Sequence, residues 1–252
     1  MKILLKYTRI LSLNVAIISI DKSIQKLCYW LVNSNISKYV CVANVHMCME
    51  AFDNPAYAGI VNNADMTVPD GRPLVWAQKL MGCKDAAQVR GSDLMKAICR
   101  TAAREGVPVG LYGGTNEALN GFKLYLRQKF PGLEIAYAIS PPFQPLTKDE
   151  DAAYCRQINA SGAKILFVGL GCPKQECWMA GHKGRINCVM IGIGAAFDFF
   201  GGTQQEAPRI MQKTGTEWVF RLMAEPRRLW KRYLKHNPRF VYYFLRQLLF
   251  HK

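Results

Sequence analysis

Glycines and polar side chains follow five apolar runs of this sequence, and these are the positions best suited to chemistry. The five stretches are "ANVH" (43–46), "VPDG" (68–71), "LYGGTNE" (111–117), "GLGCPKQE" (169–176) and "GIGAAFDFFGG" (192–202). A glycine after a strand lets backbone N–H groups approach a phosphate, and a following helix N-terminus adds positive potential. Several such strand ends together suit a nucleotide diphosphate, although neither G-x-G-x-x-G nor a P-loop is present.

Two carboxylates stand out within these stretches. Asp70 precedes a glycine, and a carboxylate near strand ends can take a hydroxyl proton if its pKa suits the task. It is therefore a candidate general base, although an ordinary Asp-Gly turn explains the same dipeptide. Asp198 falls in a predicted loop between glycines. A hydrogen bond to a ribose or base and a helix cap explain its position equally well.

Cys172 is a weaker candidate for chemistry. A cysteine nucleophile needs a positioned histidine, and the chain contains only four histidines. A structural zinc site from Cys172, Cys177, His182 and Cys188 is conceivable, but this spacing fits no standard finger or ribbon. We expect Cys172 to be a small residue that fits a tight turn before Pro173.

Strand-like and helix-like segments alternate along the chain and must position these residues. Predicted strands lie within 13–20, 38–45, 66–71, 107–114, 133–140, 163–171 and 186–199. Predicted helices follow the first strand and cover most of 46–64, then 72–82, 92–106, 115–132 and 149–162. Ser92 is the predicted cap of one helix and Gly106 its end. This alternation predicts α/β architecture with a mainly parallel sheet, whose carboxyl strand ends form the usual ligand site.

The charge is large and concentrated at one end of the chain. The formal net charge of +15 favours anionic partners, whether nucleic acid, acidic lipid or phosphorylated substrate. Residues 217–252 hold nine Lys or Arg against two Glu, interleaved with aromatic and aliphatic residues. This pattern is typical of a segment that lies on an anionic membrane, and a solvated basic helix is the alternative. No run has the roughly 18–20 apolar residues of a membrane span.

The composition shift near residue 215 predicts two parts. We expect a catalytic domain over 1–214 and a basic, amphipathic, membrane-associating appendage over 215–252. The nine cysteines are scattered and contain no C-x-x-C, which indicates reduced thiols in a cytosolic setting.

These motifs, in this order, resemble the WecG/TagA/CpsF glycosyltransferases (glycosyltransferase family 26). The resemblance spans roughly residues 13–240 and rests on "ANVHM", "VPDGRPLVW", "VRGSDLM", "LYGGTNEA", "LFVGLGCPKQECWM", "GIGAAFDFFGG" and "EWVFRLMAEPRRLWKRYL". It implies a Rossmann-like α/β core with helices on both faces. It also implies transfer of a sugar, with inversion, from a UDP-sugar to a polyprenyl-diphosphate-linked saccharide. No metal or cofactor is expected. The enzyme is expected to act at the cytoplasmic face of the plasma membrane.

The resemblance also assigns roles. The family's proposed general base falls on Asp70, its conserved asparagine on Asn44, and a carboxylate linked to uridine recognition on Asp198. Essential arginines of the family's C-terminal appendage match Arg221 and Arg228, together with Lys231 or Arg232. The appendage resembles a membrane-docking lid over the active site. Arg221 is our first choice to meet the charge on the leaving group.

Further substrate contacts are expected from the same motifs. Gln175, and secondly Lys174, are predicted donors to the nucleotide, whereas Glu176 is interpreted as a helix-start carboxylate favoured by the helix dipole. The remaining predicted substrate-binding residues are His46, Arg90, Gly113, Gly114 and Gly171.

One position departs from the family pattern. Members that transfer N-acetylmannosamine carry threonine two residues before the asparagine, and this chain has Val42 there. Valine cannot donate the hydroxyl hydrogen bond. This favours glucose or another hexose over N-acetylmannosamine as the transferred sugar.

Two other classes of protein are alternatives to this interpretation. A nucleic-acid-binding protein would explain the charge, but no recognised binding module is present and the charge is concentrated with aromatics. A nicotinamide-dependent oxidoreductase would share the sheet but lacks the glycine fingerprint. We therefore expect a UDP-sugar, a lipid-linked acceptor and an anionic membrane as partners, with no nucleic acid. The family also suggests association into homo-oligomers.

Overall fold

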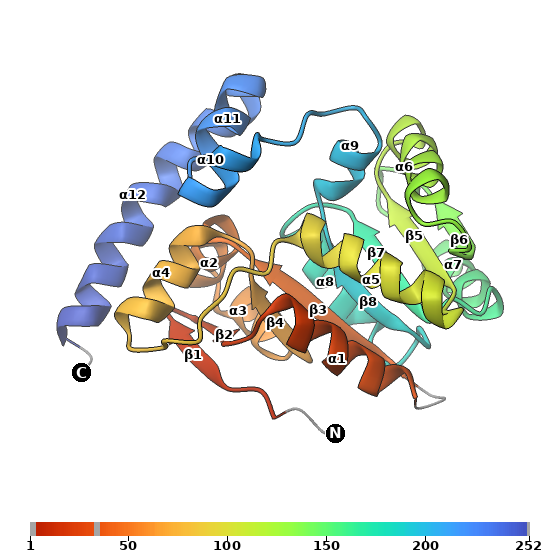
Figure 1. Cartoon of the computed structure of the whole chain (residues 1–252), viewed down its shortest axis with the longest axis horizontal. Coiled ribbons are helices and arrows are strands. Elements are labelled where there is room, and N and C mark those ends of the chain that lie inside the picture. The colour runs from red at the N-terminus through yellow and green to blue at the C-terminus, as the bar shows by residue number, and fades with distance from the viewer. Residues whose placement is uncertain (1–3, 33–35, 251–252) are drawn as a thin grey trace.

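The centre of the protein is a six-stranded parallel sheet (Figure 1). The computed structural model describes residues 4–32 and 36–250. The strands are β3 (Lys38–Ala43), β4 (Met66–Pro69), β5 (Val109–Gly113), β6 (Ile135–Ile139), β7 (Ile165–Gly169) and β8 (Val189–Gly192). Their order across the sheet is β4-β3-β8-β7-β5-β6, and every pairing is parallel. All six carboxyl ends therefore lie along one edge, and the predicted α/β class is confirmed.

The apolar sequence of these strands explains why the sheet is central. In β3, Val40 and Val42 belong to one core cluster, whereas Tyr39 and Cys41 belong to the other. Successive side chains of a strand point to opposite faces, so a strand buried on both sides needs apolar residues throughout. The sheet thus separates two hydrophobic cores.

Helices cover both faces, as the family resemblance implies. The first core cluster takes side chains from α1 (Ile20–Leu31), α5 (Gly91–Glu105), α6 (Asn116–Lys129) and α9 (Ala196–Phe200). The second takes side chains from α2 (Val45–Asp53), α3 (Pro55–Asn62), α4 (Arg72–Leu80), α7 (Lys148–Ala160) and α8 (Lys174–His182). Each helix lays an apolar stripe on the sheet and leaves its polar side outward.

An N-terminal hairpin differs from the sequence prediction. The predicted strand 13–20 is shorter, since β2 (Leu13–Ala16) ends early and Ser19 caps α1. β2 pairs antiparallel with β1 (Tyr7–Ile10), which the sequence pattern did not reveal. Leu13 and Val15 of β2 are fully buried, so tertiary packing rather than local pattern explains the hairpin.

Two further elements differ from prediction. α5 begins at Gly91, and Ser92 is not its cap because its hydroxyl donates to Oε1 of Glu206 at 3.0 Å. Gly106, in the left-handed conformation, ends α5 as expected. Asp198 lies within the short helix α9 rather than in a loop.

Three helices complete the chain: α10 (Arg209–Thr214), α11 (Glu217–Ala224) and α12 (Pro226–Phe250). α12 packs along α2 at one side of the molecule (Figure 1), and it buries Leu229, His236, Phe240 and Phe244. Within the described ranges, no helix combines the length and the apolar character needed to cross a bilayer. The expected division into 1–214 and 215–252 stays a prediction, and its outermost residues 1–3 and 251–252 lie outside the described part.

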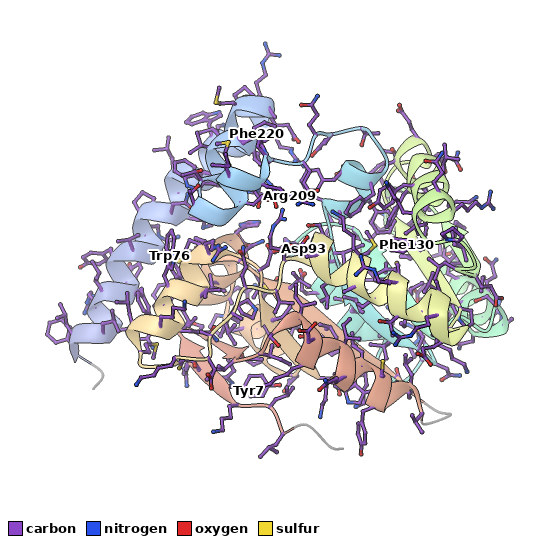
Figure 2. The ribbon with its side chains drawn as sticks, viewed as in Figure 1. Tyr7, Trp76, Asp93, Phe130, Arg209 and Phe220 are labelled. Atoms are coloured by element: carbon purple, nitrogen blue, oxygen red, sulfur yellow. The ribbon has the colours of Figure 1, made fainter. Side chains whose placement is uncertain are left out.

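A close contact joins the C-terminal helices to α4. Figure 2 places Trp76 on α4, beside these helices. Gly215 follows α10 with a φ of +76°, and a Cβ added there would meet the Trp76 ring at 2.8 Å. Glycine is therefore required at this turn, both for its backbone conformation and for the space.

Candidate active site

A pocket of about 800 Å³ lies beyond the carboxyl ends of the strands. Its walls come from residues at or after the ends of all six strands of the sheet and from α11 and α12. The predicted site residues that line it are Asn44, His46, Asp70, Arg90, Gly114, Gly171, Lys174, Gln175, Asp198, Arg221, Arg228 and Arg232. The volume is in the usual range for a ligand pocket, and its place is the usual one for a parallel sheet. The contacts of these residues with a substrate stay predictions.

Gly113 is the predicted residue that does not line the pocket. A Cβ added to Gly113 would lie 2.6 Å from the backbone of Gly169, because β5 and β7 run close together there. Gly114 is held by a hydrogen bond from its amide to the carbonyl of Gly169 at 3.0 Å. The glycine pair therefore allows close packing of two strand ends, and only Gly114 faces the cavity.

Asp70 is held firmly at the end of β4. Its amide donates to the carbonyl of Ala43 at 2.8 Å, and its own carbonyl accepts from Nε2 of Gln88 at 2.6 Å. Burial first, and the charge of Glu217 second, raise the pKa of its carboxyl group, which is about 6. Arg221 and the amide of Gly91 act in the opposite direction. A carboxyl group with this pKa exchanges protons near neutral pH, as a general base must.

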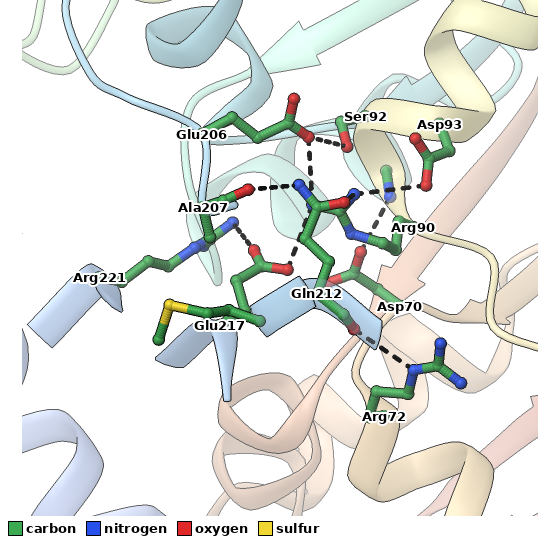
Figure 3. Close-up of polar contacts among 12 residues, drawn as sticks. Asp70, Arg72, Arg90, Ser92, Asp93, Glu206, Ala207, Gln212, Glu217 and Arg221 are labelled. Carbon is green, nitrogen blue, oxygen red and sulfur yellow. Dashed lines mark hydrogen bonds and ion pairs between the residues drawn. The ribbon is translucent and has the colours of Figure 1, made fainter. Parts of the chain in front are cut away.

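A network of charged residues surrounds Asp70 (Figure 3). Arg90 is 6% exposed, and its guanidinium contacts Glu206 at 3.1 Å and Glu217 at 3.2 Å. Arg90 also donates to Oε1 of Gln212 at 2.6 Å. Because these partners belong to the last fifth of the chain, Arg90 ties α5 to the C-terminal segment. Local sequence patterns gave no signal for Glu206, Gln212 or Glu217.

Arginines of the C-terminal helices form the other wall of the pocket. Arg221 pairs with Glu217 at 2.8 Å and lies over the Phe199 ring at 4.8 Å from its centroid. Arg228 pairs with Glu225 of the preceding turn. Nε of Arg232 is buried and has no hydrogen-bond partner in the described part of the chain. The pocket therefore presents several cationic groups opposite the strand ends.

Asn44 has a structural role that sequence alone did not reveal. Its Oδ1 accepts from the amide of Met47 at 3.1 Å, so it is the N-cap of α2. Such a cap typically contributes about 1 kcal/mol to stability. The cap fixes the backbone that carries Asn44 and His46 into the pocket.

The buried carboxylate of Glu176 stabilises the turn that follows β7. Glu176 is fully buried, and its carboxylate accepts from the Tyr57 hydroxyl at 3.0 Å and from Nε2 of Gln175 at 2.7 Å. Glu176 lies in the first turn of α8, as expected, and burial raises the pKa of its carboxyl group. Nε2 of Gln175 is thus already engaged, and its Oε1 is buried without a partner. Nε2 carries a second N–H and Oε1 has no partner among the described residues, so the predicted role of Gln175 as a donor to the nucleotide stays a prediction.

Asp198 of α9 lines the pocket and interacts electrostatically with Arg228. Burial raises the pKa of its carboxyl group, whereas the charge of Arg228 and a hydrogen bond with Thr203 lower it. Lys174 is exposed at the start of α8 and also lines the pocket. Recognition of a ribose or base by Asp198 stays a prediction.

Cys172 has no nucleophilic or zinc-binding setting. Its Sγ lies 3.3 Å from the Tyr57 hydroxyl, and burial raises its pKa well above the usual range. His182 uses one ring nitrogen on Asp151 and the other on the carbonyl of Trp178, each at 2.7 Å. The conceivable zinc set with Cys177 and Cys188 is therefore not formed, and the interpretation of Cys172 as a small turn residue agrees with this geometry.

An aromatic wall was missed by sequence reasoning. The rings of Tyr112 and Trp178 stack with centroids 4.4 Å apart, and both residues line the pocket. Nε1 of Trp178 is buried without a hydrogen-bond partner among the described residues. Aromatic faces of this kind can pack against a sugar ring or a base.

Comparison with known proteins agrees with this geometry. The model of the Glycosyl transferase WecG/TagA/CpsF family matches residues 8–252. A curated relative from Bacillus spizizenii (strain W23) is named N-acetylglucosaminyldiphosphoundecaprenol N-acetyl-beta-D-mannosaminyltransferase. It is 31% identical over 213 residues, which cover 83% of this chain and 79% of the relative. The family match spans nearly the whole sheet, the pocket and the C-terminal helices, and this chain belongs to the WecG/TagA/CpsF family of glycosyl transferases.

Proposed function

We propose that this protein is an inverting glycosyltransferase with a UDP-sugar donor and a polyprenyl-diphosphate-linked saccharide as acceptor. It moves a hexosyl or N-acetylhexosaminyl group, of the glucose or N-acetylmannosamine type, in the synthesis of a bacterial surface polysaccharide. One observation carries the proposal: the pocket holds a carboxyl group of pKa about 6, Asp70, opposite Arg221, Arg228 and Arg232. A base and a cluster of cations are what sugar transfer from a nucleotide diphosphate requires.

Asp70 is the base of the proposed reaction. Its carboxylate takes the proton of the acceptor hydroxyl as that oxygen forms a bond to the anomeric carbon. The bond from this carbon to the diphosphate oxygen breaks on the opposite face, and the electron pair leaves with UDP. A single displacement of this kind inverts the anomeric configuration. Among the carboxylates of the described lining residues, Asp70 alone directly follows a strand of the sheet.

The leaving diphosphate gains charge during this step. In the proposal, cationic side chains and backbone amides at the strand ends neutralise that charge without a metal ion at the diphosphate. Arg221 is the first candidate, since it lies between Glu217 and the Phe199 ring and faces the pocket. Arg228 and Arg232 reach the same wall from α12.

A lipid-linked acceptor requires access to a membrane. The relative from Bacillus spizizenii is named for an acceptor carried on diphosphoundecaprenol. In this chain, α12 exposes Leu234, Leu245 and Leu249 among its basic residues, at 66%, 50% and 73% exposure. An exposed apolar and basic helix supports peripheral binding to the anionic cytoplasmic face of the membrane.

A panel of UDP-sugars with a short-chain lipid-diphosphate acceptor tests the proposal, with products read by mass. We expect transfer of one hexose or N-acetylhexosamine, an inverted linkage by NMR, and no product from the Asp70→Asn protein. The sugar itself is decided by the panel, and Val42→Thr provides a second enzyme for the comparison. Absence of transfer from every UDP-sugar, with transfer from another nucleotide sugar, would overturn the donor assignment.

A further inference from the structure

Three side chains to which the proposed reaction assigns no proton transfer or charge stabilisation meet where α12 packs against α2; one of them, His46, is also a predicted substrate contact. His46 and Glu50 lie on successive turns of α2, and His236 comes from α12. Nδ1 of His46 is 3.7 Å from Oε1 of Glu50, and Nε2 of His236 is 3.4 Å from the same oxygen. The two imidazole rings are 5.1 Å apart between centroids. No hydrogen bond links the three side chains, although their nitrogen and oxygen atoms converge.

These separations have the size expected for ligands of one metal ion. In a tetrahedral zinc site with bonds of about 2.0–2.1 Å, neighbouring ligand atoms are about 3.4 Å apart. Ligand atoms of His46, Glu50 and His236 all lie within 4.8 Å of one another. Two imidazoles and one carboxylate are also a known donor set for zinc.

The tautomer of His46 supports the same conclusion. Its side chain hydrogen-bonds the backbone of Cys172, and its Nδ1 has no hydrogen-bond partner in the described part of the chain. Nε2 therefore donates to the carbonyl of Cys172, and Nδ1 directs a lone pair toward the carboxylate of Glu50. Two acceptors facing each other repel, whereas a cation between them attracts both. A metal-ligating histidine usually donates its second nitrogen to a carbonyl or carboxylate in this way.

His236, on α12, is the third proposed ligand and is buried. Its residue is 3% exposed, and its separation from Glu50 is longer than a good hydrogen bond between nitrogen and oxygen. Two nearby cations are paired with another carboxylate, because Lys235 and Arg239 both form ion pairs with Asp53. Arg232 is the remaining cation near His46.

We propose that His46, Glu50 and His236 bind a divalent transition-metal ion of the zinc type, which fastens α12 to α2. Through the hydrogen bond from His46 to Cys172, the ion also supports the turn that follows β7. Its role is to position the C-terminal helix over the pocket. This inference concerns the chain's own metal site and does not depend on the identity of the sugar substrates.

A second cluster in the same protein provides a matched control. Asp151, Cys155 and His182 also bring ligand atoms within 4.8 Å of one another. There, however, both nitrogens of His182 already have partners, Asp151 and the Trp178 carbonyl. We therefore expect no metal at this second cluster.

The test uses the full chain, stripped with a chelator and then titrated with Zn²⁺ in a calorimeter. We expect one ion per chain by elemental analysis after dialysis, and a rise in the melting temperature. Co²⁺ in place of Zn²⁺ should give the visible absorption of a four-coordinate site. Glu50→Gln and His236→Gln should each weaken binding at least tenfold, whereas His182→Gln should leave the stoichiometry unchanged.

Each outcome has a clear meaning. Circular dichroism of the metal-free variants shows whether they are folded, and Glu50→Gln keeps the size of the side chain if His236→Gln does not fold. A stripped wild-type chain that takes up no Zn²⁺ or Co²⁺ overturns the proposal. Equal binding by wild type and Glu50→Gln also overturns it, because the ion then lies elsewhere, such as on cysteine thiols. Loss of binding in the His182→Gln protein alone assigns the ion to the second cluster and equally refutes the proposed site.

Discussion

Oδ1 of Asp70 accepts a hydrogen bond of 2.9 Å from the backbone amide of Gly91, the first residue of α5. The carboxylate of a strand end thus caps a helix from the next segment of the chain. The helix N-terminus favours the ionised form of the carboxylate, whereas burial and the charge of Glu217 oppose it. The balance leaves the pKa of Asp70 at about 6, which suits proton transfer near neutral pH.

Asp70→Asn should abolish turnover and leave UDP binding nearly unchanged. The amide can still accept from Gly91 but cannot take a proton from the acceptor. The variant should also be more stable than the wild type at pH 7, by about 1–2 kcal/mol. The reason is that the raised pKa makes the folded protein bind a proton more tightly than the unfolded chain, so wild-type stability falls as the pH rises from about 4 to 6. Urea unfolding and UDP calorimetry check both parts, and retained turnover would exclude Asp70 as the base.

Glu217→Gln should shift the pH profile of kcat/KM to lower pH. The wild-type profile should rise through an apparent pKa near 6, because Asp70 must be ionised to act as a base. Removing the negative charge of Glu217 makes ionisation of Asp70 easier, so the rising limb moves toward acid. Arg221→Ala removes a positive charge and should move the same limb the other way. Shifts in the same direction for both variants would contradict the electrostatic assignment.

Arg221→Ala should lower kcat by about 10²–10³-fold, the usual effect of removing one group that stabilises developing charge. Arg227→Ala is the matched control, since Arg227 is exposed on the next helix and does not line the pocket. The control should stay within about twofold of wild type. Steady-state kinetics with saturating donor separates the loss of kcat from weaker binding, and similar effects of both substitutions would refute a specific role for Arg221.

Gln175→Ala should lose most activity, whereas Cys172→Ala should keep most of it. Oε1 of Gln175 is a buried acceptor without a partner at the edge of the pocket, so a substrate group is its natural partner. Its orientation depends on Glu176, which accepts from its amide. Cys172 only packs beside the Tyr57 hydroxyl. The kcat and KM of the two variants test these two roles. An inactive Cys172→Ala protein with native stability would show that Cys172 has a functional role.

The sheet and the location of the pocket followed from sequence because they depend on local pattern. Continuous apolar runs that end in glycine mark parallel strands, and their carboxyl ends must share an edge. Val42, noted from the family pattern, does line the pocket and is 7% exposed.

The charged network around Arg90 could not be predicted in the same way. Arg90 meets Glu206 and Glu217 more than a hundred residues later in the chain, and nothing local selects these partners. Ser92 illustrates the same limit, because the capping role assigned to it is taken by the distant carboxylate of Asp70. Gly113 followed the expected pattern for a phosphate-binding glycine, yet its space is occupied by the neighbouring strand.

The double variant Leu245→Glu, Leu249→Glu should reduce binding to anionic vesicles at least tenfold. Deleting α12 would be a poorer test, because Phe240 and Phe244 are 4% and 5% exposed and belong to the core. The two leucines are exposed, so their replacement should leave folding and transfer to a short water-soluble acceptor unchanged. The matched control is Leu80→Glu, Leu124→Glu, which changes charge equally at exposed sites outside the C-terminal helices. Vesicle sedimentation compares the two proteins, and equal losses would show that net charge rather than the α12 surface governs membrane binding.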